Sequence, residues 1–227
     1  MFKEFIQIAG IIDKEETEML LGCGIKYLGF PLRLPVNKDD LTEVSAGRII
    51  SGLPPSTHGI LITYLSNAEE IKALCEKIGT NIIQLHGEIT IDELIKLKRT
   101  FPESRIIKSL IVGKNSEEEL FNSINSFEKF VDAFITDTYN PQTGATGATG
   151  ITHDWKTSNA FVEHSKKPII LAGGLTPENV YSAIIKVRPA GVDTHTGVED
   201  NSGRKNKPKV IKFIEEAKRG FEKIKES

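Results

Sequence analysis

The sequence predicts a single (β/α)8 TIM barrel that occupies residues 1–227 as one domain. Short apolar runs rich in β-branched residues alternate with amphipathic runs of helical period, and eight such pairs fit into 227 residues. Each unit then takes about 28 residues, close to the minimum for this barrel. An open doubly wound sheet is the alternative, and it is disfavoured because no G-x-G-x-x-G pattern follows the first strand.

The predicted strands are short apolar stretches bounded by turn or polar residues. They cover residues 4–9, 27–30, 59–64, 81–85, 105–111, 133–136, 168–171 and 190–193. Each is followed by a stretch of helical character, as a barrel requires.

Start and stop signals mark several of the helices. Asn67 precedes an acidic first turn, and Gly79 closes the same helix. Ser116 opens another, and Thr176-Pro177 offers a capping residue followed by proline at the first helical position. The last helix is expected over residues 208–223.

The composition is that of a globular protein with an apolar core and a charged surface. Apolar residues make up 39% and charged residues 26%, the net charge is -2 and the isoelectric point is about 6.2, so we expect neither nucleic acid nor a membrane as partner. No signal peptide or membrane span is recognisable at the start of the chain or beyond. Cys23 and Cys75 lack metal-ligand spacing and suit a reducing compartment. We expect a cytoplasmic protein, either a monomer or a homodimer, without a metal site.

Three loops at the predicted carboxyl ends of strands six to eight suit a phosphate. They are the TGATGATG stretch at 143–150, the glycine pair after strand seven, and residues 193–197. Glycine backbone approaches an anion closely, and barrels frequently bind phosphate beside strands seven and eight. A flexible hinge or tight βα turns would explain each loop singly, but three neighbouring loops favour a small phosphorylated sugar ligand. The candidate binding residues are Thr149, Gly150, Gly173, Gly174, Asp193, His195 and Thr196.

Five longer motifs lie along the chain: QLHG at 84–87, DT at 137–138, GITHDW at 150–155, LAGGLTPENV at 171–180 and VDTHTGVE at 192–199. Together they resemble phosphoribosylanthranilate isomerase, a small (β/α)8 enzyme of tryptophan biosynthesis. The resemblance extends from Ile6 to about Lys218. It implies a cofactor-free Amadori rearrangement of N-(5-phosphoribosyl)anthranilate, in which an acid opens the sugar ring and a base then removes the C2′ proton.

The resemblance implies that Asp137 is the general acid, the alternative being an aspartate that only caps its loop. The family's base is a cysteine in a KICGI motif at the end of strand one. This chain has QIAGI at 7–11, with Ala9 in the cysteine position, and a methyl group accepts no proton. Cys23 and Cys75 are expected on helices away from the barrel mouth, so neither replaces it.

The loop after strand two also departs from the family, which usually carries an arginine there for the anthranilate carboxylate. Residues 30–37 read FPLRLPVN, with no arginine at the matching place, so Arg33 and Lys38 are the candidates. Arg33 could equally be a surface residue.

Further candidates are polar residues near strand ends. Gln84 and His86 lie in the QLHG motif, and His86 matches a ligand-contacting histidine or is a structural hydrogen bonder. His153 and His195 stand where the family usually has an apolar residue and a serine. Beside a phosphate, His195 would be a charged donor or a displaced base.

Three histories fit this pattern: a cysteine replaced by mutagenesis, a diverged barrel for another sugar phosphate, or a binding protein without turnover. The changed strand-two loop disfavours the first, and Asp137 disfavours the last. We expect an isomerase-like protein with impaired or altered activity.

Overall fold

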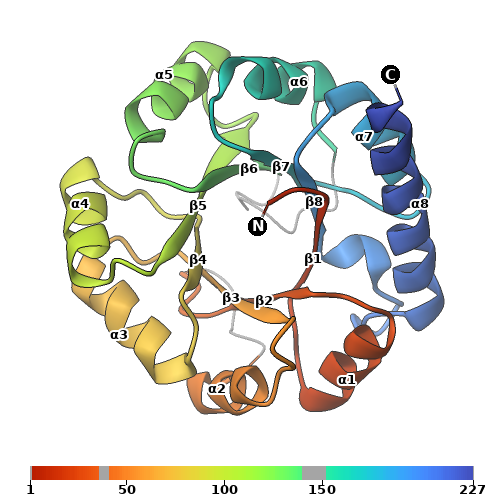
Figure 1. Ribbon diagram of the computed structural model, residues 1–227, viewed down its shortest axis with the longest axis horizontal. Helices are drawn as coiled ribbons and strands as arrows, with labels where there is room; N and C mark the ends of the chain where they lie inside the picture. Colours follow the sequence, from red (N-terminus) through yellow and green to blue (C-terminus); the bar gives the residue numbers. More distant parts are fainter. Residues whose placement is uncertain (1, 36–40, 140–151, 227) are drawn as a thin grey trace.

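The computed structural model describes residues 2–35, 41–139 and 152–226, and these form a closed barrel of parallel strands in the order β1 to β8 (Figure 1). The strands are β1 Phe5–Ala9, β2 Tyr27–Pro31, β3 His58–Thr63, β4 Ile82–Leu85, β5 Arg105–Val112, β6 Ala133–Thr138, β7 Ile169–Leu171 and β8 Gly191–Thr194. The predicted fold class is confirmed.

Within the described residues a helix follows each strand and lies outside the barrel (Figure 1). The helices are α1 Lys14–Gly22, α2 Glu43–Ser51, α3 Ala68–Ile78, α4 Ile91–Thr100, α5 Glu117–Phe127, α6 Trp155–His164, α7 Val180–Val187 and α8 Lys207–Lys225, with the 3-10 turn η1 Thr196–Val198 before α8.

The predicted helix signals act where expected. The Asn67 side chain accepts hydrogen bonds from the backbone N–H groups of the first turn of α3, and Gly79 ends that helix at a φ of 77°. Ser116 and Glu119 cap α5 reciprocally. Pro208 lies in the first turn of α8, where its missing N–H costs no helical hydrogen bond.

Regular helix α7 begins at Val180 rather than near Thr176, although Thr176 caps the turn before it: its Oγ1 accepts from Glu178 N at 3.2 Å and its O from Val180 N at 3.0 Å. The reason lies in Asn179, whose side-chain amide makes two hydrogen bonds to backbone groups earlier in the chain. Its Oδ1 accepts from Thr176 N at 2.8 Å, and its Nδ2 donates to Gly174 O at 2.9 Å. These bonds hold the preceding residues in a turn that leads into the helix.

Strand β6 is longer than predicted and continues to Thr138. It does so because β5 remains paired with it through Ile111↔Asp137 and Val112↔Thr138. Asp137 therefore lies inside the end of a strand, where its backbone pairs with β5, rather than in the following loop.

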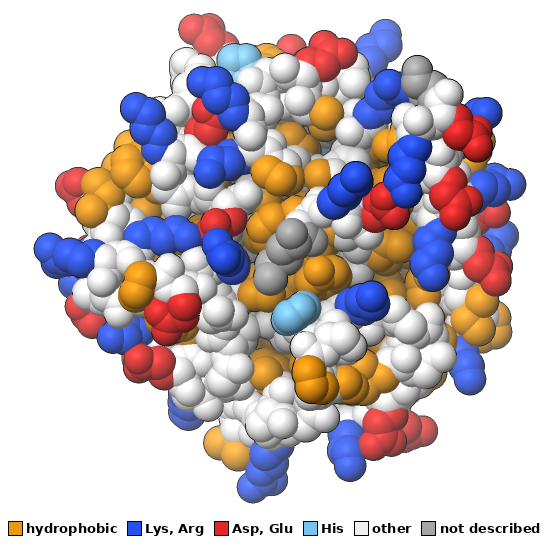
Figure 2. Space-filling model, viewed as in Figure 1, with side chains coloured by type: hydrophobic (Ala, Val, Ile, Leu, Met, Phe, Trp, Pro, Cys, Tyr) orange, Lys and Arg blue, Asp and Glu red, His pale blue; other side chains and the backbone are white. Residues whose placement is uncertain are grey.

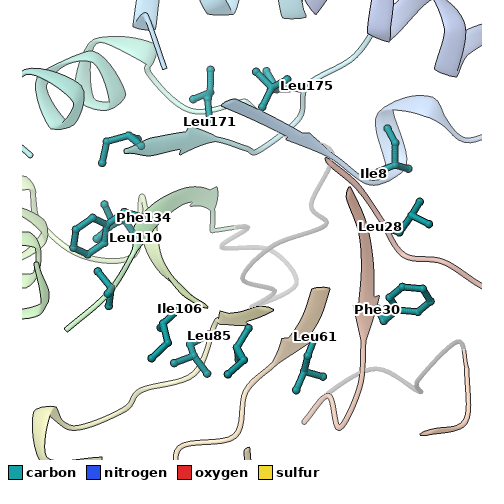
Figure 3. Packing of buried hydrophobic residues seen from close by; sticks show 14 of the residues in the cluster. Ile8, Leu28, Phe30, Leu61, Leu85, Ile106, Leu110, Phe134, Leu171 and Leu175 are labelled. Carbon is teal, nitrogen blue, oxygen red and sulfur yellow. The ribbon is translucent and has the colours of Figure 1, made fainter. Parts of the chain in front are cut away.

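Alternation along the strands divides the core into two parts. Side chains on the outer face point away from the barrel axis toward the helices, as Figure 3 shows for Ile8, Leu28, Phe30, Leu61, Leu85, Ile106, Leu110, Phe134, Leu171 and Leu175. A second cluster fills the barrel interior near the strand starts. It contains Phe2, Phe5, Ile60, Ile82, Ile107, Ala133, Ile135, Ile170 and Ala172, and we call it the lower layer.

The N-terminal residues cover the barrel at the end where the strands begin. Phe2 packs on Phe5 with ring centroids 5.6 Å apart, and the N-terminus lies over the middle of the barrel in Figure 1. Seen from the same side, Lys, Arg, Asp and Glu are interspersed around hydrophobic side chains near the centre (Figure 2). The end of the barrel where the strands begin is thus closed by side chains, and a site for a ligand is expected at the carboxyl ends of the strands.

The longest helix, α8, has 19 residues and buries one apolar face that includes Phe213, Ala217 and Phe221. Most of its exposed positions carry lysine, arginine or glutamate. Among the helices of the described ranges, none combines the length and apolar character needed to cross a membrane.

Candidate active site

Above the lower layer, the inward side chains become polar. Gln7 of β1, Gln84 of β4, Asp137 of β6 and Asp193 of β8 are at most 8% exposed, and His86 follows β4 with a 5% exposed side chain. We call these five residues the polar layer. It lies at the carboxyl ends of the strands, where (β/α)8 barrels carry their chemistry.

The polar layer is linked across the barrel. Gln7 Nε2 donates to Gln84 Oε1 at 2.9 Å, and Gln84 Nε2 lies 2.7 Å from His86 Nε2. With Gln84 as donor, His86 Nε2 accepts and its proton is on Nδ1. Nδ1 in turn lies 3.7 Å from Asp137 Oδ2, beyond a direct hydrogen bond but within electrostatic reach.

His86 is uncharged in this setting. Burial, and then the positive charge of Lys108, lower its pKa to about 3. Lys108 is itself a buried lysine on β5, and burial lowers its pKa to about 8. His86 is thus neutral, with its Nδ1 turned toward Asp137 but too far away for a direct hydrogen bond.

Asp137 has the electrostatics of a proton donor. Burial raises its pKa to about 7, against the opposing effect of the Thr138 backbone N–H, which donates to Oδ1 at 2.8 Å. Both protonation states are therefore populated near neutral pH, which suits a general acid.

Asp193 holds its proton more strongly. Burial and then the negative charge of Asp137 raise its pKa to about 8, while Lys205 and Gln7 oppose the shift. A carboxyl group that remains protonated at neutral pH donates hydrogen bonds and is a poor base.

Three buried polar atoms of this layer have no hydrogen-bond partner in the described part of the chain. They are Gln7 Oε1, His86 Nδ1 and Asp193 Oδ1. Buried polar atoms are rarely left without a partner in proteins. A polar ligand or water in the barrel would satisfy all three.

Among the described residues, the loop after β7 contacts the ends of β6 and β8. Gly173 has a φ of 96°, and a Cβ there would overlap Thr138 Oγ1, so only glycine fits at this contact. Gly174 has a φ of 62°, and Thr194 Oγ1 donates to Leu175 O at 2.7 Å. Thr149 and Gly150 lie outside the described residues.

His153, two residues before the start of α6, contacts both the end of β6 and α6 itself. Its Nδ1 lies 3.0 Å from Thr138 Oγ1, and its Nε2 lies 2.5 Å from Ser158 Oγ. Burial lowers the pKa of His153 to about 4, so it is a neutral bridge that holds α6 against β6.

Ala9 ends β1 and is 4% exposed. Beyond it, Gly10 has a φ of 77° and lies directly against the imidazole of His195, which a Cβ at Gly10 would overlap. His195 follows β8, its side chain is 26% exposed, and its Nε2 lies 3.4 Å from Glu199 Oε1. Thr196, the next residue, opens η1.

Arg33 lies in the loop after β2 with a φ of 55°. Its Nε donates to Glu43 Oε1 at 2.8 Å, and Glu43 Oε2 also binds Lys77 Nζ at 2.5 Å. These contacts hold Nε of Arg33 at α2, beside the barrel wall. Lys38 lies outside the described residues.

Cys75 lies on a helix as predicted, whereas Cys23 lies one residue beyond the end of α1. Cys75 is buried within α3. Burial raises the pKa of Cys75 to about 12, so its thiol stays protonated.

The sequence analysis missed Gln7 and Lys108. A signal for Gln7 was present, because it shares the inward face with Phe5 and Ala9 on β1 and is the polar residue among the three. Lys108 stands in an apolar run on the outward face of β5 between Ile106 and Leu110, where only the fold shows its burial.

A cavity of about 480 Å³ lies between α1 and α2, lined by residues that include Ile12, Leu21, Leu41 and Ile49. It is outside the barrel and contains none of the polar layer. We assign the site from the polar side chains, because they supply the acid and hydrogen-bonding groups that chemistry requires.

Comparison with known proteins agrees with this architecture. Residues 32–216 match the family model of N-(5'-phosphoribosyl)anthranilate (PRA) isomerase. The N-(5'-phosphoribosyl)anthranilate isomerase 2 of Methanosarcina mazei is 39% identical over 222 residues, covering 97% of this chain and 96% of that protein.

Solved structures agree as well. Monomers generated from the dimeric phosphoribosylanthranilate isomerase of Thermotoga maritima superpose with a TM-score of 0.79 at 28% identity, covering 95% of this chain and 99% of that one. A phosphoribosyl anthranilate isomerase in complex with reduced 1-(o-carboxyphenylamino)-1-deoxyribulose 5-phosphate gives a TM-score of 0.78 at 28% identity, with the same coverage. The chain therefore belongs to the phosphoribosylanthranilate isomerase family.

Proposed function

We propose that this protein isomerises N-(5-phosphoribosyl)anthranilate to the corresponding aminoketose phosphate, and that it does so more slowly than relatives with a base cysteine. The observation that carries the proposal is Asp137, a buried carboxyl group with a pKa of about 7 that faces the barrel interior at the end of β6. Family membership supplies the reaction class.

Asp137 is the acid of the first step. Its proton goes to the furanose ring oxygen, the C1′–O bond breaks, and the nitrogen lone pair forms the iminium. The carboxylate left behind accepts a hydrogen bond from the Thr138 N–H at 2.8 Å, and His86 Nδ1 lies 3.7 Å from it, within electrostatic reach. The same two groups thus favour the charge that develops in the transition state.

The loops after β6, β7 and β8 are the proposed phosphate site, with Gly173, Gly174, Thr196 and the 149–150 pair as its residues. Support comes from the left-handed glycines and from the contacts of the loop after β7 with the ends of β6 and β8. A related enzyme binds a ligand with a 5-phosphate, which is consistent with such a site.

The rest of the ligand is proposed to face the polar layer. Gln84, His86 and Asp193 line the interior there, and His86 and Asp193 carry unpaired polar atoms. Arg33 is our candidate for the anthranilate carboxylate, and Glu43 competes for its guanidinium.

Turnover and binding together test the proposal. Purified protein is mixed with phosphoribosylanthranilate, the ketose product is quantified by chromatography, and binding of the reduced product analogue is measured by calorimetry. We expect binding and slow turnover. Binding without any turnover would identify a non-catalytic binding protein, and loss of both would indicate a different sugar phosphate, which a thermal-shift screen of sugar phosphates would reveal.

Ala9→Cys tests how much of the family machinery is missing. If the cysteine alone were absent, the change would raise the turnover rate by orders of magnitude. We expect little gain, because the strand-two loop also departs from the family, and a base without a correctly held substrate loses its orientation advantage.

A further inference from the structure

The polar layer contains a chain of hydrogen bonds that crosses the barrel from β1 to the end of β4. Gln7 Nε2 donates to Gln84 Oε1 at 2.9 Å, although the two residues are 77 positions apart in the sequence. Gln84 Nε2 then lies 2.7 Å from His86 Nε2. Gln7 and Gln84 are at most 2% exposed, so bulk water does not compete for these bonds. We call these three side chains the amide relay.

The amide relay has one direction, because the two ends of an amide group differ in what they donate and accept. The NH2 group of Gln7 donates to Gln84, and a hydrogen bond from Gln7 to the carboxyl group of Asp193 opposes the rise in the pKa of that group. The nitrogen of Gln7 therefore faces both neighbours. Gln84 must then present its oxygen to Gln7 and its own NH2 group to His86.

Gln84 in turn decides which nitrogen of His86 carries the proton. Burial, and then the charge of Lys108, hold the pKa of His86 at about 3, so the ring is neutral and has one N–H group. Its Nε2 faces a donor and must accept, which leaves the proton on Nδ1. Within the described ranges Nδ1 has no hydrogen-bond partner, and Asp137 Oδ2 lies 3.7 Å from it. The amide relay thus directs an N–H group toward the acid.

The tautomer of His86 matters to Asp137 both before and after the acid gives up its proton. A bare Nδ1 facing the protonated carboxyl group would attract that proton and compete with the substrate for it. An Nδ1–H group does not compete, and its dipole favours the carboxylate that is left behind. Thr138 N donates to the other oxygen, Oδ1, so Oδ2 is the oxygen that the ring of His86 faces.

We propose that Gln7 is a positioning residue for the acid: through Gln84 it holds His86 in the Nδ1–H tautomer, which keeps the proton of Asp137 available to the substrate. The effect on turnover rests on the proposed function, whereas the effect on the tautomer does not. Gln7 acts through two other side chains, so its removal should change the state of His86 before any substrate is bound.

Nitrogen NMR of the protein without substrate tests the amide relay directly. The histidine rings are isotopically labelled, the His86 signals are identified by their loss in His86→Gln, and their shifts report which ring nitrogen carries the proton. We expect Nδ1–H in the unmodified protein. Gln7→Met retains an unbranched side chain but has no donor, and should give Nε2–H or a mixture of tautomers. Gln7→Lys restores a donor that cannot accept, and should keep Nδ1–H.

Turnover of phosphoribosylanthranilate measures what the tautomer contributes. Gln7→Met should lower kcat about tenfold, the effect of one hydrogen bond, with KM within a few-fold. Ser109→Ala is the matched control, because Ser109 on β5 is also buried and its Oγ donates to Leu85 O at 2.9 Å, outside the amide relay. The control variant should change neither kcat nor the His86 signals.

Several results would overturn the proposal: Nε2–H in the unmodified protein, Nδ1–H retained in Gln7→Met, Nδ1–H lost in Gln7→Lys, or a changed tautomer with unchanged kcat. An equal loss of kcat in Ser109→Ala would also count against it. Should Gln7→Met fail to fold by circular dichroism, Gln84→Met breaks the amide relay at its next bond and replaces it. If the unmodified protein shows no turnover, the proposed function fails, and the NMR signals still decide whether Gln7 sets the tautomer.

Discussion

The lower and polar layers of one barrel differ in what they contribute, and β6 shows the difference most directly. Ile135 and Asp137 are both inward, two residues apart, and almost fully buried. Ile135 packs in an apolar cluster, where burial stabilises the fold. Asp137 is buried as a carboxyl group whose ionisation is disfavoured, at a cost in stability that serves proton transfer.

The same gradient runs along β1 and β8. Phe5 fills the lower layer, Gln7 joins the polar layer, and Ala9 ends the strand. On β8, Gly191 packs against Phe5, and Asp193 follows in the polar layer. The apolar packing of the lower layer therefore offsets the cost of burying the polar side chains of the polar layer.

Asp137→Asn should have the largest effect on turnover. Loss of a positioned acid lowers kcat roughly 10²–10⁴-fold, about 3–5 kcal/mol of transition-state stabilisation. Affinity for the reduced analogue should stay within a few-fold, and the thermal midpoint at pH 8 should not fall, because the buried charge is removed. Steady-state kinetics, calorimetry and thermal denaturation check these points, and near-normal turnover would remove Asp137 from the mechanism.

Ile135→Ala should lower stability rather than turnover. Removing a buried isoleucine side chain costs about 2–5 kcal/mol of unfolding free energy, through lost burial and the cavity that remains. Activity per folded molecule should change little. Urea denaturation and kinetics on the same preparation compare the two, and a kcat loss as large as that of Asp137→Asn would show that the layers are not separable.

Asp193→Asn should change how stability depends on pH. The carboxyl group has a pKa near 3.8 when unfolded and about 8 when folded, so the folded state binds the extra proton between these values. Its contribution to stability is full below about pH 4 and is lost as pH rises toward 8. The variant should match the unmodified protein at low pH and exceed it at pH 8, by up to roughly 5–6 kcal/mol if the whole rise in pKa from 3.8 to about 8 is expressed. Parallel melting curves across this range would contradict the buried carboxyl.

Gly174→Val should have the smallest effect, confined to ligand binding. The added side chain would obstruct close approach of the backbone to phosphate and strain a left-handed residue, weakening analogue affinity about tenfold. Gly24→Val is the control, since Gly24 has a φ of 85° and open space around it, beyond the end of α1. Equal affinity in the two variants, measured by calorimetry, would count against the phosphate site.

Local features were predictable because their causes are local. The cap at Asn67, the glycine stop at Gly79 and the strand pattern depend on residues a few positions apart, and the structure confirms them. The start of α7 was missed because Asn179 bonds back to Gly174 and Thr176, a choice among side-chain partners that periodicity does not reveal. The end of β6 was missed because the neighbouring β5 extends it.

By itself, the sequence determined the barrel, the placement of Asp137 at a strand end, and the absence of an accepting group at Ala9, since these follow from residue identity and periodicity. Only the tertiary structure decided the protonation of Asp137 and the meeting of His195 with Gly10. Burial and strand register set these properties, and both arise when residues more than 100 positions apart are brought into one barrel.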